Sequence, residues 1–129
     1  MENIIKNFES DSPYYPAVNF NVSTGICEIS GESYMEEAYK FYLPLIDWLK
    51  KYTTELRKPI TLNFKLTYFN TASSRLILDI LDLLKKYSDY GGDVKISWFY
   101  DPADPDILDE IEDFEIETGL KIQLKQLNM

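Results

Sequence analysis

The amino-acid sequence predicts an α/β fold, in which a single five-stranded mixed sheet carries its helices mainly on one face. Short runs of alternating apolar and polar residues take turns along the chain with longer segments of helical period, an order typical of strands joined by helical crossovers. The alternation also indicates that one sheet face meets water, because strands buried on both faces read as continuous apolar runs. At 129 residues the chain suits one compact domain, so we expect residues 1–129 to form a single domain.

The first elements are a hairpin and a helix. Residues 17–22 (AVNFNV) alternate, Ser-Thr-Gly follows, and residues 26–30 (ICEIS) alternate again, which predicts two antiparallel strands joined by a tight turn. Residues 31–52 repeat apolar side chains at spacings of three and four, which predicts a helix. Pro44 lies inside that segment and has no backbone N–H, so we expect a kink or a break near residues 40–44.

The central strand is predicted at residues 60–69 (ITLNFKLTYF), where alternate side chains face the core: Ile60, Leu62, Phe64, Leu66 and Tyr68. A second helix follows from the joint at Asn70 and Thr71 to about Tyr90, where two glycines end it. This strand and helix form the most regular part of the pattern.

The last third of the chain adds a strand, a helix and a strand. Residues 94–100 (VKISWFY) alternate. Asp104 suits an N-cap and Pro105 the first helical position, which predicts a helix over residues 105–118 that ends at Gly119. Residues 120–125 (LKIQLK) form the last expected strand. On the uncovered sheet face we expect four lysines: Lys65, Lys95, Lys121 and Lys125.

The residue types exclude several classes of active site. The chain contains no histidine, which rules out Ser-His-Asp and Cys-His catalysis and histidine-rich metal sites. Cys27 is the single cysteine, so no intrachain disulfide can form, and we expect it to be an ordinary half-buried thiol on a strand. Asp79, Asp82 and Asp89 are expected to form the solvent edge of a helix. We therefore expect no catalytic residues, no metal and no cofactor.

The net charge of −9 is concentrated in one segment. Residues 101–117 contain nine acidic residues and no Lys or Arg, while acids and bases balance in the rest of the chain. We expect no nucleic-acid or membrane partner, because both are bound by clustered basic residues. The segment is either a solvated helix face or a docking face for a basic partner through Asp109, Glu112 and Asp113. Without a bilayer-spanning run or a signal-peptide pattern, a cytoplasmic location is expected.

A cluster of hydroxyls lies between the central strand and the second helix, at Thr71, Ser73 and Ser74. Asn70 or Thr71 can cap the helix by accepting a backbone N–H. The free amides and the positive end of the helix dipole also favour an anion, so a phosphate on Thr71 would be held there. Arg75 lies one turn further along and can reach it. From the residues alone both roles stay open, and capping is the commoner one.

Two segments resemble known families. The layout resembles the anti-sigma-factor-antagonist (STAS) domains, whose phosphorylated hydroxyl lies where a central strand enters a helix. The closer resemblance is to the SiaC-like regulatory phosphoproteins of bacteria. Residues 31–52 (GESYMEEAYKFYLPLIDWLKKY) are similar to that family's Gly-x-Ser-Tyr-Pro-Glu, Phe-Tyr-x-Pro-Leu and Trp-Leu segment, with Met35 in place of the usual proline. Residues 62–84 (LNFKLTYFNTASSRLILDILDLL) are similar to its strand, its Tyr-x-Asn-Thr-Ser-Ser turn and its helix, with Ala72 in place of the first serine.

The resemblance, which covers roughly residues 17–125, implies a partner-switching protein. A cognate protein kinase would phosphorylate the threonine of the turn, which matches Thr71, and a metal-dependent protein phosphatase would remove the phosphate. The unphosphorylated form would bind and activate an effector such as a diguanylate cyclase, which raises cyclic di-GMP and favours biofilm formation. Ala72 leaves the phosphate acceptor in place.

Other interpretations stay open beside this one. The chain can instead be a small-ligand or nucleotide-binding STAS-like module, or an anti-sigma-factor antagonist. Tyr39 and Tyr42 flank the aromatic stripe of the first helix. We expect these two side chains to be partly exposed; core packing is the commoner role of such a stripe, and contact with a partner is the alternative.

Overall fold

Six strands and three α-helices make up the part of the chain that the structure describes. The structure is a computed structural model and describes residues 1–8 and 14–127. Its strands are β1 (Ile4–Lys6), β2 (Ala17–Phe20), β3 (Ile26–Ser33), β4 (Ile60–Phe69), β5 (Val94–Tyr100) and β6 (Gln123–Gln126). Its helices are α1 (Ala38–Lys51), continued by a π-helical turn η1 (Tyr52–Leu56), then α2 (Thr71–Asp89) and α3 (Ile107–Thr118). The strands lie side by side in sequence order in one sheet.

The expected number of five strands is wrong because a sixth strand, β1, lies at the sheet edge. It pairs antiparallel with β2, with Ile4 opposite Phe20 and Lys6 opposite Val18. A strand of three residues is too short to show alternation, so only its pairing with β2 reveals it.

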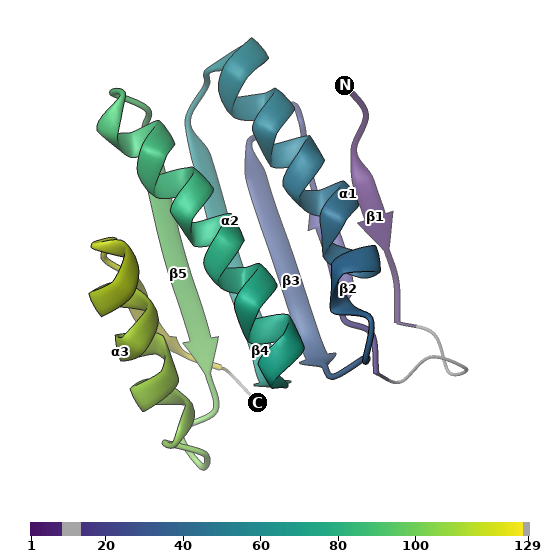
Figure 1. Ribbon diagram of the computed structural model, residues 1–129, viewed down its shortest axis with the longest axis vertical. Helices are drawn as coiled ribbons and strands as arrows, with labels where there is room; N and C mark the ends of the chain where they lie inside the picture. Colours follow the sequence, from purple (N-terminus) through teal and green to yellow (C-terminus); the bar gives the residue numbers. More distant parts are fainter. Residues whose placement is uncertain (9–13, 128–129) are drawn as a thin grey trace.

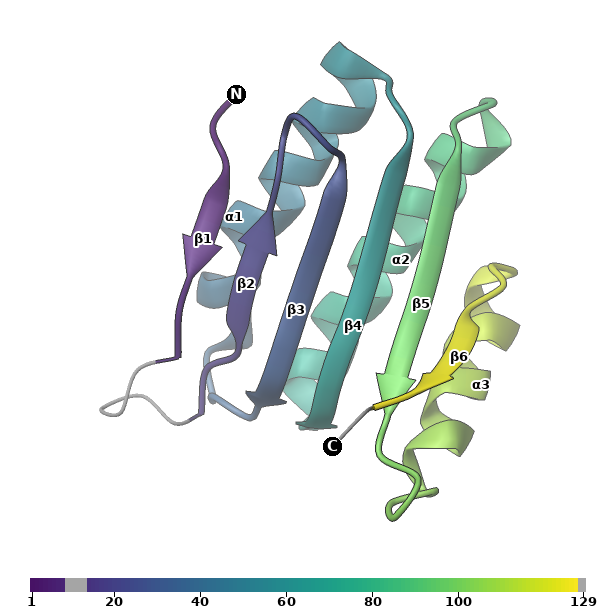
Figure 2. The same cartoon turned by 180° about the vertical axis from the view of Figure 1, so that it is seen from behind.

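All three helices cover the same face of the sheet, as the alternation predicted (Figures 1 and 2). Strands β3 to β6 are mutually parallel, and each helix connects one strand to its immediate neighbour. Crossovers of this kind are right-handed, so successive crossovers in one direction place their helices on one side. The opposite face is bare in Figure 2.

The bare face carries the expected lysines of the sheet strands. Opposite residues in the register are Thr61 and Lys95, and further along Phe99 and Lys125. Lys65 pairs with Glu28 across the face at 2.8 Å. Lys121 lies just before β6 and is exposed. This face is therefore polar, which is why water can replace a second helix layer.

The predicted hairpin and central strand are confirmed, with one exception at the end of the central strand. β2 pairs antiparallel with β3, and β4 spans Ile60–Phe69. Tyr68, expected in the core, is 50% exposed, while Phe69 is buried. The register between β3 and β4 shifts between Gly31 and Glu32, so that Leu66 lies opposite Gly31 but Tyr68 lies opposite Glu32. The extra residue of this bulge, Thr67, shifts the alternation by one position, so that Phe69 instead of Tyr68 faces the core.

The first helix is shorter than predicted and is not broken. Residues 31–33 continue β3, because they still pair with β4, and α1 begins only at Ala38. The helix runs through Pro44, so of the expected kink or break the break is wrong. Pro44 removes the hydrogen bond to the carbonyl of Lys40, which lies in the first turn. Both residues are exposed, so water can satisfy that carbonyl.

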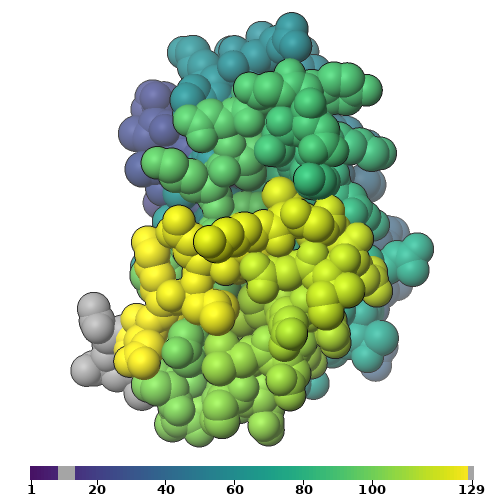
Figure 3. Space-filling view, turned by 90° about the vertical axis from the view of Figure 1, so that its left-hand side faces the viewer, coloured from purple at the N-terminus to yellow at the C-terminus, as the bar shows by residue number. Residues whose placement is uncertain are grey.

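The second helix is confirmed, and the elements around the third are shifted. α2 ends at Asp89, with Gly91 in a left-handed conformation just beyond. α3 begins at Ile107 after a turn, so Asp104 is not its N-cap and Pro105 is not its first residue. Gly119 ends α3 with φ 76°, as predicted. The last strand is limited to Gln123–Gln126, which pairs with β5. Figure 3 shows this end of the molecule, formed by α3 and the chain that follows it.

The core lies between the sheet and the helix layer. Its largest fully buried side chains are aromatic, among them Trp98, Tyr42 and Phe64. Trp98 stacks on Phe64 with ring centroids 4.5 Å apart and donates its indole N–H to the Leu66 carbonyl at 3.2 Å. The core therefore fixes the end of β4, from which α2 departs.

Candidate functional site

The hydroxyl cluster lies at the N-terminus of α2, directly after the central strand β4. Asn70 has extended backbone angles, and its side-chain oxygen accepts the backbone N–H of Ser73 at 2.8 Å. Asn70 is therefore the N-cap. Thr71 is the first helical residue and is exposed, and its hydroxyl takes part in no hydrogen bond within residues 1–8 and 14–127. The capping and the exposed hydroxyl thus belong to two different residues.

Ser73 points the other way, into a buried network of hydroxyls. Its side chain is fully buried and accepts a hydrogen bond from the Ser33 hydroxyl at 2.7 Å. The Ser33 hydroxyl also lies 2.7 Å from the hydroxyl of Tyr42, and the sulfur of Met35 contacts both serine hydroxyls. Burial raises the pKa of Tyr42 to about 12. Tyr42 is therefore a neutral core residue, and the expectation that it is partly exposed is wrong.

Asn70 ties this network to the helix end. Its backbone N–H donates to the Ser33 carbonyl at 2.9 Å, and its side-chain amide donates to the Met35 carbonyl at 3.1 Å. Its own carbonyl accepts the backbone N–H of Ser74 at 2.9 Å. Asn70 thus holds three segments together through its side chain and its backbone: the end of β3, the loop before α1 and the start of α2. Thr71 sits on a rigid support.

Ser74 faces a third environment, which is acidic. It lines a groove of about 260 Å³ between α2 and α3, together with Glu110, Asp113 and Glu117. Burial, and then the charges of Asp104, Asp113 and Asp106, raise the pKa of Glu110 above its usual value. A phosphate on Ser74 would meet like charge there. Of the three hydroxyls, Thr71 is therefore the one that can accept a dianion without breaking the core or entering an acidic groove.

The predicted partner-contact residues lie in separate places. Tyr39 is 55% exposed on α1, as expected. Asp109, Glu112 and Asp113 are exposed on α3. Helix α2 lies between α1 and α3 (Figure 1), so these residues do not form one patch. Arg75 is exposed on α2, one turn beyond Thr71.

An aromatic chain beside the hydroxyl cluster was missed by the sequence analysis. Tyr14, Tyr34 and Tyr68 follow one another edge to face, with centroids 4.5 Å apart for the first pair and 5.4 Å for the second. Tyr14 and Tyr68 are about half exposed. Tyr68 lies three residues before Thr71, so these rings flank the same end of the sheet. The alternation of β4 placed Tyr68 in the core and therefore concealed this cluster.

Cys27 and the three aspartates of α2 are the other side chains weighed for chemistry from the sequence. Cys27 is fully buried rather than half-buried, and burial raises its pKa to about 12. Asp79, Asp82 and Asp89 are exposed along α2, as predicted. Within the part of the chain that the structure describes, no three His, Cys, Asp or Glu side chains are grouped to hold a metal ion. Of the helices in that same part, none is long and apolar enough to cross a membrane.

Known proteins are similar to this chain in sequence and in fold. Residues 9–127 match the family model described as SiaC family regulatory phosphoprotein. The chain is 31% identical over 110 residues to an uncharacterized protein of Pseudomonas aeruginosa strain UCBPP-PA14, covering 85% of this chain and 87% of that protein. The crystal structure of apo-SiaC from Pseudomonas aeruginosa has a TM-score of 0.88 at 26% identity, covering 97% of this chain and 99% of that one.

A further structural neighbour includes a partner. It is a chain in the crystal structure of the diguanylate cyclase SiaD in complex with its activator SiaC, from Pseudomonas aeruginosa. The TM-score is 0.86 at 25% identity, covering 98% of this chain and all of that one. The fold and the site define a small α/β protein with one bare sheet face and one exposed hydroxyl at a helix N-terminus. This chain belongs to the SiaC family of regulatory phosphoproteins, which confirms the family resemblance of its sequence.

Proposed function

We propose that this protein is a non-enzymatic switch of the cytoplasm. A cognate kinase phosphorylates Thr71, and a metal-dependent phosphatase removes the phosphate. The unphosphorylated form binds and activates an effector such as a diguanylate cyclase. The observation that carries the proposal is the division of roles at the start of α2, where Asn70 caps the helix and leaves the exposed Thr71 hydroxyl unused.

The helix end favours the phosphorylated state electrostatically. α2 has no acidic residue in its first turn, so the positive end of its dipole is not neutralised there. A phosphate brings about −1.5 to −2 charges and three strong acceptor oxygens. Free backbone N–H groups and the exposed Arg75 side chain lie within the first turns of the same helix. The modified side chain is therefore stabilised where it stands.

The switch needs no large movement. Asn70 and Ser73 hold the helix start against β3 and the loop before α1 through the contacts described above. A new dianion on this rigid surface must be desolvated or paired when a partner binds. A partner surface that fits a neutral hydroxyl offers no such pairing, so binding is weakened by charge alone.

The experiment compares three forms of the protein against a purified effector. Incubation with the kinase and ATP, followed by intact-mass analysis and site mapping, is expected to place one phosphate on Thr71. The phosphorylated form should bind the effector at least about tenfold more weakly, because an unpaired desolvated charge costs more than 1.4 kcal/mol. Thr71→Ala should remain fully active as a binder and refuse phosphate. Because Asn70 is the cap, Thr71→Ala should change the free energy of unfolding by less than about 0.5 kcal/mol.

Two results would contradict the proposal. Phosphate found on Ser73 or Ser74 would show that the kinase reads another hydroxyl. Equal affinity of the bare and phosphorylated forms for the effector would show that the modification is not the switch.

A further inference from the structure

A second concave surface lies away from Thr71, in the helix layer. It is a groove of about 790 Å³ between α2 and the helix α1 with its continuation η1; α1 and α2 lie side by side in Figure 1. Aliphatic side chains such as Leu43 and Leu76 line it, together with the two tyrosines Tyr87 and Tyr90. Tyr90 is 85% exposed. The volume is in the range of sites that hold small organic molecules.

Three cations line this groove: Lys50, Arg57 and Lys86. Within residues 1–8 and 14–127, three ion pairs form and none of them includes these side chains. Lys50 and Lys86 lie in the last turns of α1 and α2, where the helix dipole favours positive charge. That reason does not account for Arg57, which lies beyond the end of η1.

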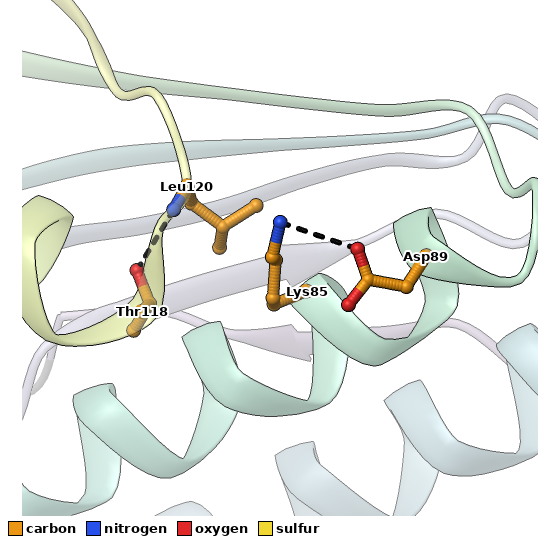
Figure 4. Close-up of polar contacts among 4 residues, drawn as sticks. All are labelled: Lys85, Asp89, Thr118 and Leu120. Atoms are coloured by element: carbon orange, nitrogen blue, oxygen red, sulfur yellow. Dashed lines mark hydrogen bonds and ion pairs between the residues drawn. The ribbon is translucent and has the colours of Figure 1, made fainter.

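Arg57 occupies a backbone position that suits glycine. Its φ is 53°, and in the described residues every other positive φ belongs to a glycine. Its backbone N–H closes η1 by donating to the Tyr52 carbonyl at 2.9 Å. At the end of α3, shown in Figure 4, the corresponding left-handed position is filled by Gly119, between Thr118 and Leu120. An arginine is strained in the left-handed conformation, whereas glycine is not. Glycine would therefore end η1 with less strain, so the need to end the helix does not explain why this position has an arginine side chain.

The backbone around Arg57 is unusual as well. The preceding turn, Tyr52–Leu56, is π-helical, a rare geometry that is frequent at functional sites. Strained residues also gather where a side chain must be aimed at a ligand. The groove, its three cations, which form no ion pair with another described residue, and the strained backbone therefore coincide at one place.

We propose that this groove binds a phosphate monoester with an apolar or aromatic body. The phosphate lies between Arg57, Lys50 and Lys86, whose charges offset its own, and the guanidinium can form two parallel hydrogen bonds to it. The body lies along the aliphatic lining with Tyr90 as a stacking surface. Asp79 and Asp82 line the same groove, so the body carries no second negative charge. Thr71 does not line this groove, so the site is distinct from the proposed phosphorylation site.

The test uses NMR titration of the full chain with three probes: adenosine 5′-monophosphate, hexyl phosphate and inorganic phosphate. We expect at least one of the two monoesters to shift the amide signals of Leu43, Tyr87 and Tyr90 at lower concentration than inorganic phosphate does. The two monoesters distinguish an aromatic body from an aliphatic one. Arg57→Gly should weaken this binding at least about tenfold, since it removes a charge-assisted hydrogen bond.

Arg57→Gly also separates binding from folding. Glycine relieves the left-handed strain, so the unfolding temperature of this variant should be unchanged or higher while its affinity falls. Lys51→Gln is the matched control, because Lys51 is exposed on α1 outside the groove, and it should bind as the wild type does. The proposal is overturned if neither monoester binds, if inorganic phosphate binds equally well, or if Arg57→Gly keeps its affinity.

Discussion

The N-termini of α2 and α3 stabilise their free backbone N–H groups in different ways. α2 begins with a side-chain cap at Asn70 and has no acid in its first turn. The N-cap residue of α3, Asp106, makes no side-chain cap bond, and the first turn of that helix carries Asp109 and Glu110. Both arrangements satisfy a helix N-terminus, the first by hydrogen bonding and the second by charge. The difference teaches that the positive end of α2 is still available to an anion, whereas that of α3 is already neutralised.

The two ends also differ in how firmly they are held. The start of α2 is joined to β3 and α1 through Asn70, Ser73 and Tyr42. The turn before α3 is held by local backbone bonds, such as that from the Leu108 N–H to the Pro105 carbonyl at 3.0 Å. Thr71 therefore lies on a helix end that other elements hold in place. The acidic residues at the start of α3 lie on a helix end that is held by bonds to neighbouring residues in the chain.

The largest effect should come from removing the cap of α2. Asn70→Ala deletes the bond to the Ser73 N–H and leaves the Met35 carbonyl without its donor. We expect the free energy of unfolding, measured in urea, to fall by about 2 kcal/mol. The matched change at α3, Asp106→Ala, should cost less than about 0.5 kcal/mol because Asp106 makes no cap bond. Equal losses at the two helices would contradict the comparison.

A smaller loss is expected from Tyr42→Phe. The change removes one buried hydroxyl but leaves Ser33 and Ser73 bonded to each other, so it should cost about 1 kcal/mol. The pKa of Tyr42 is raised from 10.0 to about 12, so its neutral form is favoured in the folded state. The wild type should therefore keep this contribution below pH 10.0 and lose it as the pH rises toward about 12. Urea unfolding at several pH values should show that the free energy of unfolding falls less steeply with rising pH in Tyr42→Phe than in the wild type. An equally steep fall in both proteins would argue against the buried network.

The acidic face of α3 is tested by charge reversal. If it docks a basic partner, changing Asp109, Glu112 and Asp113 together to lysine should weaken effector binding about tenfold, as measured by titration calorimetry at physiological salt. The matched control changes Asp47, Glu55 and Asp93, exposed acids outside α3, to lysine. The control should bind normally. Equal weakening by both triples would mean that only net charge matters, and unchanged affinity would identify the α3 face as merely solvated.

The smallest effect concerns Glu110. Burial and the neighbouring acids raise its pKa, so its ionised form is disfavoured in the folded protein. The free energy of unfolding therefore rises as the pH falls and Glu110 becomes protonated. Glu110→Gln should therefore be slightly more stable than the wild type at pH 7, with the difference disappearing at pH values below the usual 4.5 of a glutamate. Thermal unfolding at both pH values measures this. A variant that is less stable at pH 7 would show that the side chain has a favourable contact instead.

The sequence by itself determined the regular elements and singled out Thr71 as the proposed phosphorylation site. Strands β4 and β5 and helix α2 were predicted within a residue or two, because periods of two and of 3.6 are local properties of the chain. The one-sided helix layer followed from the same alternation. Thr71 was identified from its place at the joint and from family resemblance, and its exposure agrees with that choice. Its phosphorylation stays a prediction.

Only the tertiary structure decided which side chains around that joint are inside. Ser73 and Thr71 are both small hydroxyls, yet one is fully buried because Ser33 and Tyr42 lie against it and the other is exposed. Tyr42 and Tyr68 exchanged their expected environments, the first by packing of α1 on the sheet and the second through the bulge in β4, where Thr67 is the extra residue. The pairing of β1 and the groove beside Arg57 likewise join segments far apart in sequence. Burial depends on the neighbours that an element meets in space, and no local period carries that information.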